Sequence, residues 1–148
     1  MPRRSQIYRG REREIVYRML IDILHAYHSG YSHVNEPFGT GVETLLIAAC
    51  VALGDLEGKP FCASKVAAYL GVPRTTVIRK LEKLEKVGGL VYRTGRHYRV
   101  REQLLNSPSA KRTFDKIRIV LDKSFHDLSF VDQSPARACD SPSGSLNG

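Results

Sequence analysis

Apolar side chains recur at helical spacing in two long stretches, one near each end of the chain. In residues 6–28, Ile15, Met19 and Ile23 follow one another at intervals of four, and Ser29-Gly30 ends the pattern. In residues 107–131 the same periodicity runs through Phe114, Ile117, Val120, Leu121, Phe125 and Leu128. Each stretch predicts a long amphipathic helix.

Residues 44–56 lie between these helices and are apolar at almost every position. A helix that is apolar on most sides must be buried on most sides, so this one is expected to form the centre of the core. Residues 31–41 contain Pro37, Gly39 and Gly41, which predicts a loop before that helix.

Two shorter amphipathic helices are predicted next, over residues 63–70 and 73–87. Gly71-Val72 separates them in a tight turn, Pro73 suits the first turn of the second helix, and Gly88-Gly89 ends it. The apolar positions of the pair are Val66, Ala67 and Leu70 on the first helix and Val77, Leu81 and Leu84 on the second.

A β-hairpin is predicted after these helices, with strands over residues 90–94 and 97–101. Gly95-Arg96 fits a two-residue type II′ turn because glycine comes first. Alternation assigns Leu90, Tyr92, Tyr98 and Val100 to one face, and Arg93, His97 and Arg99 to the other.

The order of these elements predicts a mainly α protein: a winged helix-turn-helix with a two-stranded β-wing and long flanking dimerisation helices. A small residue, a glycine and an aliphatic residue at the spacing of Ala67, Gly71 and Val77 are typical of a helix-turn-helix. The expected organisation is N-terminal helices for dimerisation and core over residues 1–58, the DNA-binding region over 59–104, a C-terminal dimerisation helix over 105–131, and a disordered tail over 132–148, which is rich in Ser, Pro, Gly and Ala.

Part of the chain resembles known bacterial regulators. The stretch VAAYLGVPRTTV at residues 66–77, together with Leu81 and residues 84–88, resembles the DNA-binding core of MarR-type regulators, and the similarity covers roughly residues 60–101. The segment GRHYRV at residues 95–100 is also similar to the wing of IclR-type regulators, which carry a large effector domain after the wing. MarR-type regulators dimerise through their terminal helices, so the resemblance implies a homodimer on double-stranded DNA.

The positions of the charges along the chain say more about function than the net charge of +8. Residues 72–112 carry eleven Lys or Arg against three Glu, whereas residues 19–58 carry no Lys or Arg and five acidic residues. A basic block of this kind is the electrostatic signature of a polyanionic partner, and it coincides with the predicted helix-turn-helix and wing.

The candidate DNA contacts on the second short helix include the residues off its apolar stripe, which are expected to face solvent: Arg74, Thr75, Thr76, Arg79, Lys80 and Lys83. Arg79 is the best candidate for a bidentate contact to guanine in the major groove. Thr75 and Thr76 suit a base edge or a phosphate, and the methyl group of a Thr or of Ile78 suits a thymine methyl group. Lys80, Lys83 and Lys86 suit phosphates.

The hairpin adds three further candidates. Arg93, Arg96 and Arg99 are expected to enter a minor groove, whose narrow A·T stretches attract arginine.

Other chemistry is weakly indicated. Cys50, Cys62 and Cys139 are odd in number and show no CxxC spacing, which argues against a disulfide framework or a four-cysteine zinc site. Cys50 is expected to be an inert core thiol, while a redox switch at Cys62 stays an alternative. A metal shared by His25, His28 and His33 is disfavoured, so we expect no metal or cofactor.

The leading hypothesis is a sequence-specific transcriptional regulator that binds double-stranded DNA as a homodimer. No catalytic constellation is visible, so an enzyme is not expected. The alternatives are a winged-helix module for protein or RNA contact in a larger assembly, and a thiol- or metal-responsive DNA-binding sensor. No apolar run approaches the roughly 18 residues of a membrane span, and no signal peptide is visible, which predicts a cytoplasmic protein without a membrane partner. The operator, the sign of regulation and any small-molecule effector stay open.

Overall fold

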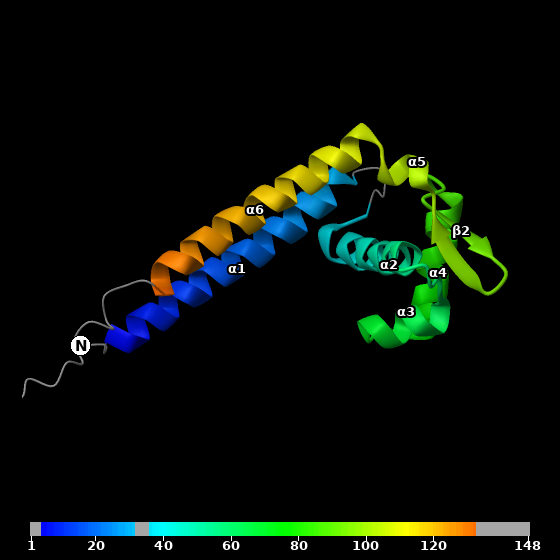
Figure 1. Cartoon of the computed structure of the whole chain (residues 1–148). Coiled ribbons are helices and arrows are strands. Elements are labelled where there is room, and N and C mark those ends of the chain that lie inside the picture. Colours follow the sequence, from blue (N-terminus) through cyan, green and yellow to red (C-terminus); the bar gives the residue numbers. More distant parts are fainter. Residues whose placement is uncertain (1–3, 32–35, 133–148) are drawn as a thin grey trace, which may run out of the picture.

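The computed structural model describes residues 4–31 and 36–132, and its two longest helices lie side by side. Helix α1 (Arg4–Gly30) and helix α6 (Pro108–Asp132) run antiparallel and project as a pair from the rest of the molecule (Figure 1). They approach closely at Gly30, where a Cβ atom would lie 1.9 Å from Thr113 Oγ1. Both predicted terminal helices are confirmed; the predicted tail, apart from residue 132, lies outside the described residues.

Helix α2 (Phe38–Leu56) passes through the core, where Leu45, Ile47 and Val51 are fully buried. The prediction of a loop up to residue 41 is wrong, because the helix begins at Phe38 with Pro37 at its N-cap. Gly41 lies in the first turn of α2 because the turn presses against α1: a Cβ atom there would lie 2.6 Å from His28 Nε2. Glycine is needed at position 41 for the close approach of α2 to α1, and not for a turn.

By length and composition alone, α2 is apolar enough to cross a membrane, contrary to the expectation that no stretch reaches that length. The same composition is typical of the central helix of a hydrophobic core. In this structure α2 contacts α1, α4 and the small sheet, and its inner residues belong to the main apolar cluster.

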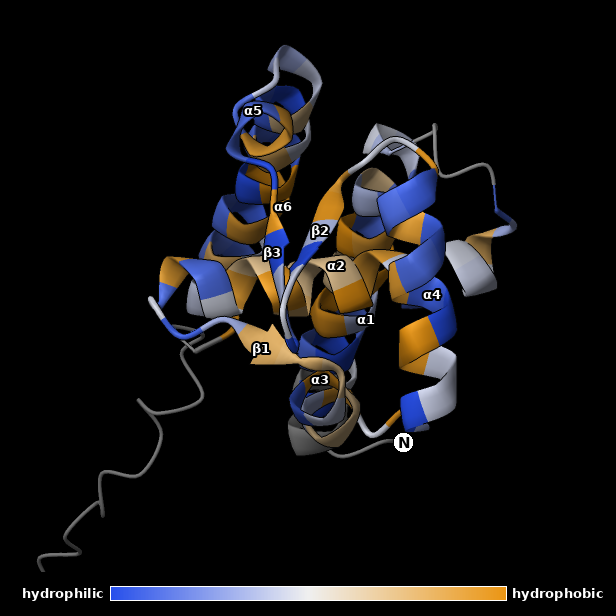
Figure 2. Ribbon diagram, turned by 90° about the vertical axis from the view of Figure 1, so that its right-hand side faces the viewer, coloured by the Kyte–Doolittle hydropathy of each residue, from blue (hydrophilic) through white to orange (hydrophobic). Residues whose placement is uncertain are grey.

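Helix α3 (Ala63–Leu70) and helix α4 (Arg74–Lys86) are confirmed close to their predicted bounds. Gly71 caps α3 with a left-handed backbone at φ 68°, a conformation that glycine adopts at little cost. Val66, Val77 and Leu81 are fully buried against α2. Figure 2 shows α4 with alternating hydrophobic and hydrophilic bands, as expected for a helix with one buried side.

The sheet has three antiparallel strands in the order β1-β3-β2. The hairpin of β2 (Val91–Thr94) and β3 (His97–Val100) was predicted, and Gly95 has the positive φ, 63°, that its turn requires. The additional strand β1 (Phe61–Cys62) pairs with β3 and is too short to produce a sequence pattern. A short helix, α5 (Glu102–Leu105), connects the hairpin to α6.

The predicted facing of β2 is wrong. Val91 lies opposite Val100 and is buried, whereas Tyr92 lies opposite Arg99 on the other face. Leu90 is also buried, but it precedes the strand, so counting the alternation from Leu90 shifts the strand by one residue. A shift of one residue exchanges the two faces. The molecule is therefore mainly helical, with a small three-stranded antiparallel sheet at one side of its core.

Candidate nucleic-acid interface

The outward side of α4 is a straight row of four exposed residues. Thr75, Arg79, Glu82 and Lys86 are spaced by four, three and four positions, which places them one above another on a helix. The buried stripe of Val77, Leu81 and Leu84 lies on the opposite side of the helix. Arg79 is thus presented from the middle of a helix whose other side is fixed in the core.

Glu82 was not recognised from the sequence, although its spacing from Arg79 and Lys86 was sufficient to find it. The exposed carboxylate stands between two cationic side chains in the same row. A carboxylate at this position repels phosphates, but it can accept a hydrogen bond from the amino group of cytosine. It therefore reduces the net charge of the row and adds a hydrogen-bond acceptor to it.

The predicted contacts in the first half of α4 differ in how far their side chains are exposed. Arg74 is exposed, and its Nε donates a hydrogen bond to Ser64 Oγ of α3 at 3.0 Å, which ties the first turns of the two helices together. Thr76 and Ile78 are only half-buried, and Ile78 packs against the main core cluster. Ile78, a predicted contact to a thymine methyl group, therefore has most of its side chain against the core.

The prediction that Lys80 faces solvent is also wrong. Its side chain is only 6% exposed, and Nζ lies 3.4 Å from Glu36 Oε2. Position 80 comes three residues after Val77 and four before Leu84, so it lies at the edge of the buried stripe. The aliphatic stem is covered by the core, and the ammonium group meets the carboxylate at the start of α2.

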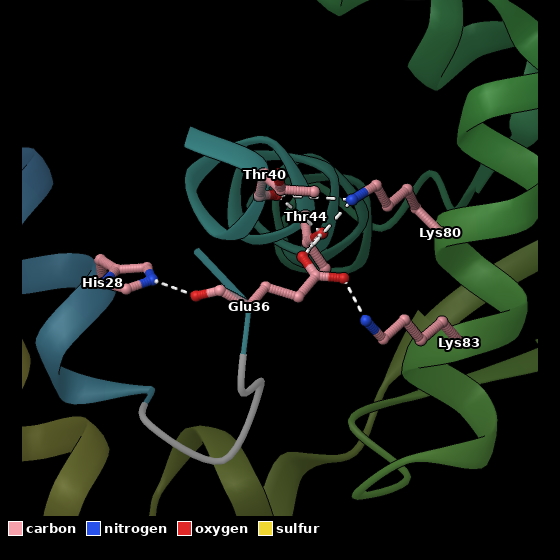
Figure 3. Close-up of polar contacts among 6 residues, drawn as sticks. All are labelled: His28, Glu36, Thr40, Thr44, Lys80 and Lys83. Atoms are coloured by element: carbon pink, nitrogen blue, oxygen red, sulfur yellow. Dashed lines mark hydrogen bonds and ion pairs between the residues drawn. The ribbon is translucent and has the colours of Figure 1, made fainter. Parts of the chain in front are cut away.

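Lys83 is exposed over 45% of its side chain, but it is not independent of the core. Its Nζ donates to Glu36 Oε1, so two lysines of α4 share one carboxylate (Figure 3). Burial raises the pKa of Glu36, but the hydrogen bonds from Lys83 and Thr44 and the charge of Lys80 outweigh it and hold the pKa below its usual value. Glu36 is therefore ionised at neutral pH.

The arginines of the hairpin do not share a face. Arg93 lies opposite Tyr98, whereas Arg99 lies opposite Tyr92, so the predicted common face of Arg93 and Arg99 is wrong. Arg93 Nε donates to the carbonyl oxygen of Gly95 in the turn at 2.8 Å. Arg96 is exposed at the tip of the hairpin.

Arg99 is held by Asp55, at the end of α2. Its Nε donates to Asp55 Oδ1 at 2.7 Å, and the backbone N–H of Val100 donates to Asp55 Oδ2 at 2.8 Å. The carboxylate thus fastens β3 to α2 and neutralises the charge of Arg99. Of the three predicted hairpin contacts, Arg96 is the one best placed to reach outward.

The thiols and histidines give little support to a sensor. Burial raises the pKa of the Cys50 thiol, which keeps it protonated, and Cys62 is half-buried at the N-cap of α3. His28 Nε2 donates to the carbonyl oxygen of Glu36 at 3.1 Å. His33 and Cys139 lie outside the described residues; among those described, no group of three His, Cys, Asp or Glu side chains is arranged to hold a metal.

An apolar cavity of about 250 Å³ lies where the α1–α6 pair meets the core. Tyr27, Leu45, Leu90 and Phe114 contribute to its walls. The hydroxyl group of Tyr27 donates to the carbonyl oxygen of Leu45 at 3.1 Å, and burial raises the pKa of this phenol. The chemistry of the walls suits an apolar ligand.

Comparisons of the chain with models of known families, with curated proteins and with solved structures found no match. The similarity of residues 60–101 to MarR-type regulators therefore stays a prediction. What the chain does has to be argued from the geometry of α3, α4, the hairpin and the α1–α6 pair.

Proposed function

We propose that this protein is a sequence-specific transcriptional regulator that binds double-stranded DNA as a homodimer, with α3, α4 and the β2–β3 hairpin acting as a winged helix-turn-helix. The observation that carries the proposal is the outward row of α4. Arg79 and Lys86 stand exposed on a helix that is buried on its other side, and a hairpin with Arg96 at its tip follows along the chain. A rigid helix with cationic and hydrogen-bonding side chains on its outer face suits the major groove.

Three side chains of the row and one of the hairpin have distinct tasks in this proposal. Arg79 donates two hydrogen bonds to a guanine, and Thr75, one turn nearer the helix N-terminus, contacts a base edge or a phosphate. Lys86, at the end of the helix, pairs with a phosphate. Arg96 enters the neighbouring minor groove, most favourably where A·T base pairs narrow it.

Dimerisation is supported by a second apolar stripe on the helix pair. Tyr17, Leu20 and Ile21 on α1 and Leu121 and Phe125 on α6 are exposed although α1 and α6 already pack on each other. Among the side chains that the structure describes, eight of the thirteen large apolar ones that are exposed belong to these two helices. A second copy is the occupant that fits, because two such pairs form a four-helix bundle that buries the same stripe from both chains.

The two-fold arrangement also fits the proposed task. A dimer presents two copies of α4, which suits two half-sites of a near-palindromic operator. The alternatives are less well supported: a redox sensor would have to use Cys62 alone of the described thiols, since Cys50 is buried and protonated. A protein- or RNA-contacting winged helix predicts no preference among duplex sequences.

The test is a titration of the full chain with duplexes selected from a random pool, with scrambled duplexes and with an RNA hairpin. Raising the salt concentration from about 50 to about 200 mM should weaken duplex binding by about a hundredfold or more, because counterions released from the phosphates return. The selected duplex should bind more tightly than its scrambled version. Affinity that does not change with salt, or tighter binding to RNA than to any duplex, would overturn the proposal.

A further inference from the structure

The side chain of Glu36 connects the start of α2 to α4. Oε2 accepts hydrogen bonds from Thr44 Oγ1 at 2.6 Å and from Lys80 Nζ at 3.4 Å, while Oε1 accepts one from Lys83 Nζ. Figure 3 shows the carboxylate between α2 and the two lysines of α4. The side chains of Glu36 and Lys80 are each only 6% exposed, so their ion pair is enclosed, whereas Lys83 reaches the same carboxylate from the surface.

The backbone of the same residue is held by α1. His28, in the last turn of α1, donates to the carbonyl oxygen of Glu36 at 3.1 Å, and Gly41 leaves the room that this approach needs. A single residue therefore joins the end of α1, the first turns of α2 and the middle of α4. Its contacts come from three different helices, which fixes the residue in place.

We propose that Glu36 is a positioning residue for DNA binding, which holds α4 against the start of α2 and withholds the charge of Lys83 from the phosphates. This inference rests on the proposed function of α4. Lys83 can move to a phosphate only by giving up its hydrogen bond to Glu36 Oε1. The enclosed carboxylate would then keep Lys80 as its one remaining lysine partner. An enclosed charge that loses a partner is costly, so the ion pair persists when DNA binds.

The salt dependence of DNA binding measures this directly, because its slope counts the phosphates that the protein neutralises. Lys83 and Lys86 lie three positions apart on α4, are both exposed and carry the same charge. Lys86 belongs to the outward row of α4, whereas Lys83 lies beside that row and is paired with Glu36. The proposal predicts that Lys86 contributes to the slope and that Lys83 does not.

The first experiment compares Lys83→Gln with Lys86→Gln in the full chain on one duplex over a series of salt concentrations. Lys86→Gln should lower the slope by about one per chain, and Lys83→Gln should leave it unchanged. Both side chains are exposed, so both variants are expected to fold. An equal loss of slope in the two variants would overturn the inference.

The second experiment releases Lys83 by removing the charge of Glu36. Glu36→Gln should make the slope steeper by about one per chain and tighten binding to selected and scrambled duplexes alike. Adding Lys83→Gln should return the slope to its original value. Glu57→Gln is the matched control: it removes one negative charge at the other end of α2, where no lysine of α4 is released, and should leave the slope unchanged.

Removing the carboxylate also leaves Lys80 enclosed without its partner, so the fold of each variant is checked by circular dichroism. If Glu36→Gln unfolds, Glu36→Gln combined with Lys80→Met removes both buried charges and carries the same expected slope. An unchanged slope in a folded Glu36 variant overturns this inference and leaves the proposed function standing. A wild-type chain that does not bind duplex DNA overturns the proposed function itself.

Discussion

The core around α2 and the α1–α6 pair bury their apolar side chains to very different extents. Around α2, Leu45, Ile47, Val51 and Leu81 have no exposed surface. Among the described side chains of α1 and α6, Ile15 is the only large apolar one that is buried. One region has covered its own apolar surface, and the other has not.

The difference follows from how many neighbours each helix has. Helix α2 contacts α1, α3, α4 and strands β1 and β3, so most of its surface meets another element. Helices α1 and α6 meet mainly each other, and two helices in contact bury only one stripe apiece. The stability of the core should therefore be a property of one chain, while that of the helix pair should depend on association.

The largest effect is expected in the core. Leu81→Ala should lower the free energy of unfolding by about 2–5 kcal/mol, because it opens a cavity among fully buried neighbours. Urea titrations at two protein concentrations should give the same loss. Leu20→Ala, on the exposed stripe of α1, should have a smaller effect that shrinks as the protein is diluted, because the lost contact exists only in the dimer. A Leu20→Ala effect that is independent of concentration would remove the distinction between the two regions.

Charges on the exposed stripe of α6 should separate the chains. Leu121→Glu combined with Phe125→Glu should weaken dimerisation by at least about a hundredfold, or about 2.7 kcal/mol, because each carboxylate would be buried without a partner. Sedimentation velocity at micromolar concentration measures the shift from dimer to monomer. Lys116→Glu, on the other side of α6, serves as the control and should stay dimeric. An unmodified chain that sediments as a monomer would contradict the dimer.

A third prediction compares two positions on the row of α4 that the core holds in place. Arg79→Ala should cost about 1–3 kcal/mol on the selected duplex and relax the preference at one base pair of each half-site. Lys86→Ala should weaken the selected and scrambled duplexes about equally, since it loses only a phosphate contact. Titration of both variants against both duplexes decides between the roles. Equal losses of affinity for both duplexes in both variants would show that Arg79, like Lys86, contacts only a phosphate.

The smallest effect is expected at the contact that joins the two regions. The pKa of Glu36 lies below its ordinary value of 4.5, so the ionised carboxylate contributes stability above that value. This contribution should disappear as the pH falls below 4.5 and through the folded-state pKa. Urea midpoints measured from neutral pH downward should drop more steeply for the wild type than for Glu36→Gln. Parallel curves would contradict the assigned ion pair.

Sequence patterns sufficed for the elements whose signals are local. The periodicity of Val77, Leu81 and Leu84 located α4, and the positive φ of Gly71 and Gly95 was anticipated from the turns in which they lie. The same periodicity placed Arg79 on the outer side, and it places Glu82 and Lys86 there as well. In each case the decisive neighbours are within a few residues along the chain.

Sequence patterns gave wrong predictions where the interacting residue is distant along the chain. Lys80 and Lys83 look equivalent to Lys86 along the sequence, yet they meet Glu36, which is 44 and 47 positions away. Arg99 meets Asp55 across 44 positions, and strand β1 exists only because β3 pairs with it. The one-residue shift of β2 was decided by the pairing of Val91 with Val100.

The amino-acid sequence alone thus determined which segments form helices and hairpins, since backbone conformation and one-sided burial depend on residues a few positions apart. It also placed the basic block over the part of the chain that contains α4 and the hairpin. Only the tertiary structure decided which of those basic side chains face outward and which are paired with a carboxylate. The reason is physical: the pairing of a charge depends on which groups the fold brings within a few ångströms of it, and charge order along the chain does not contain that information.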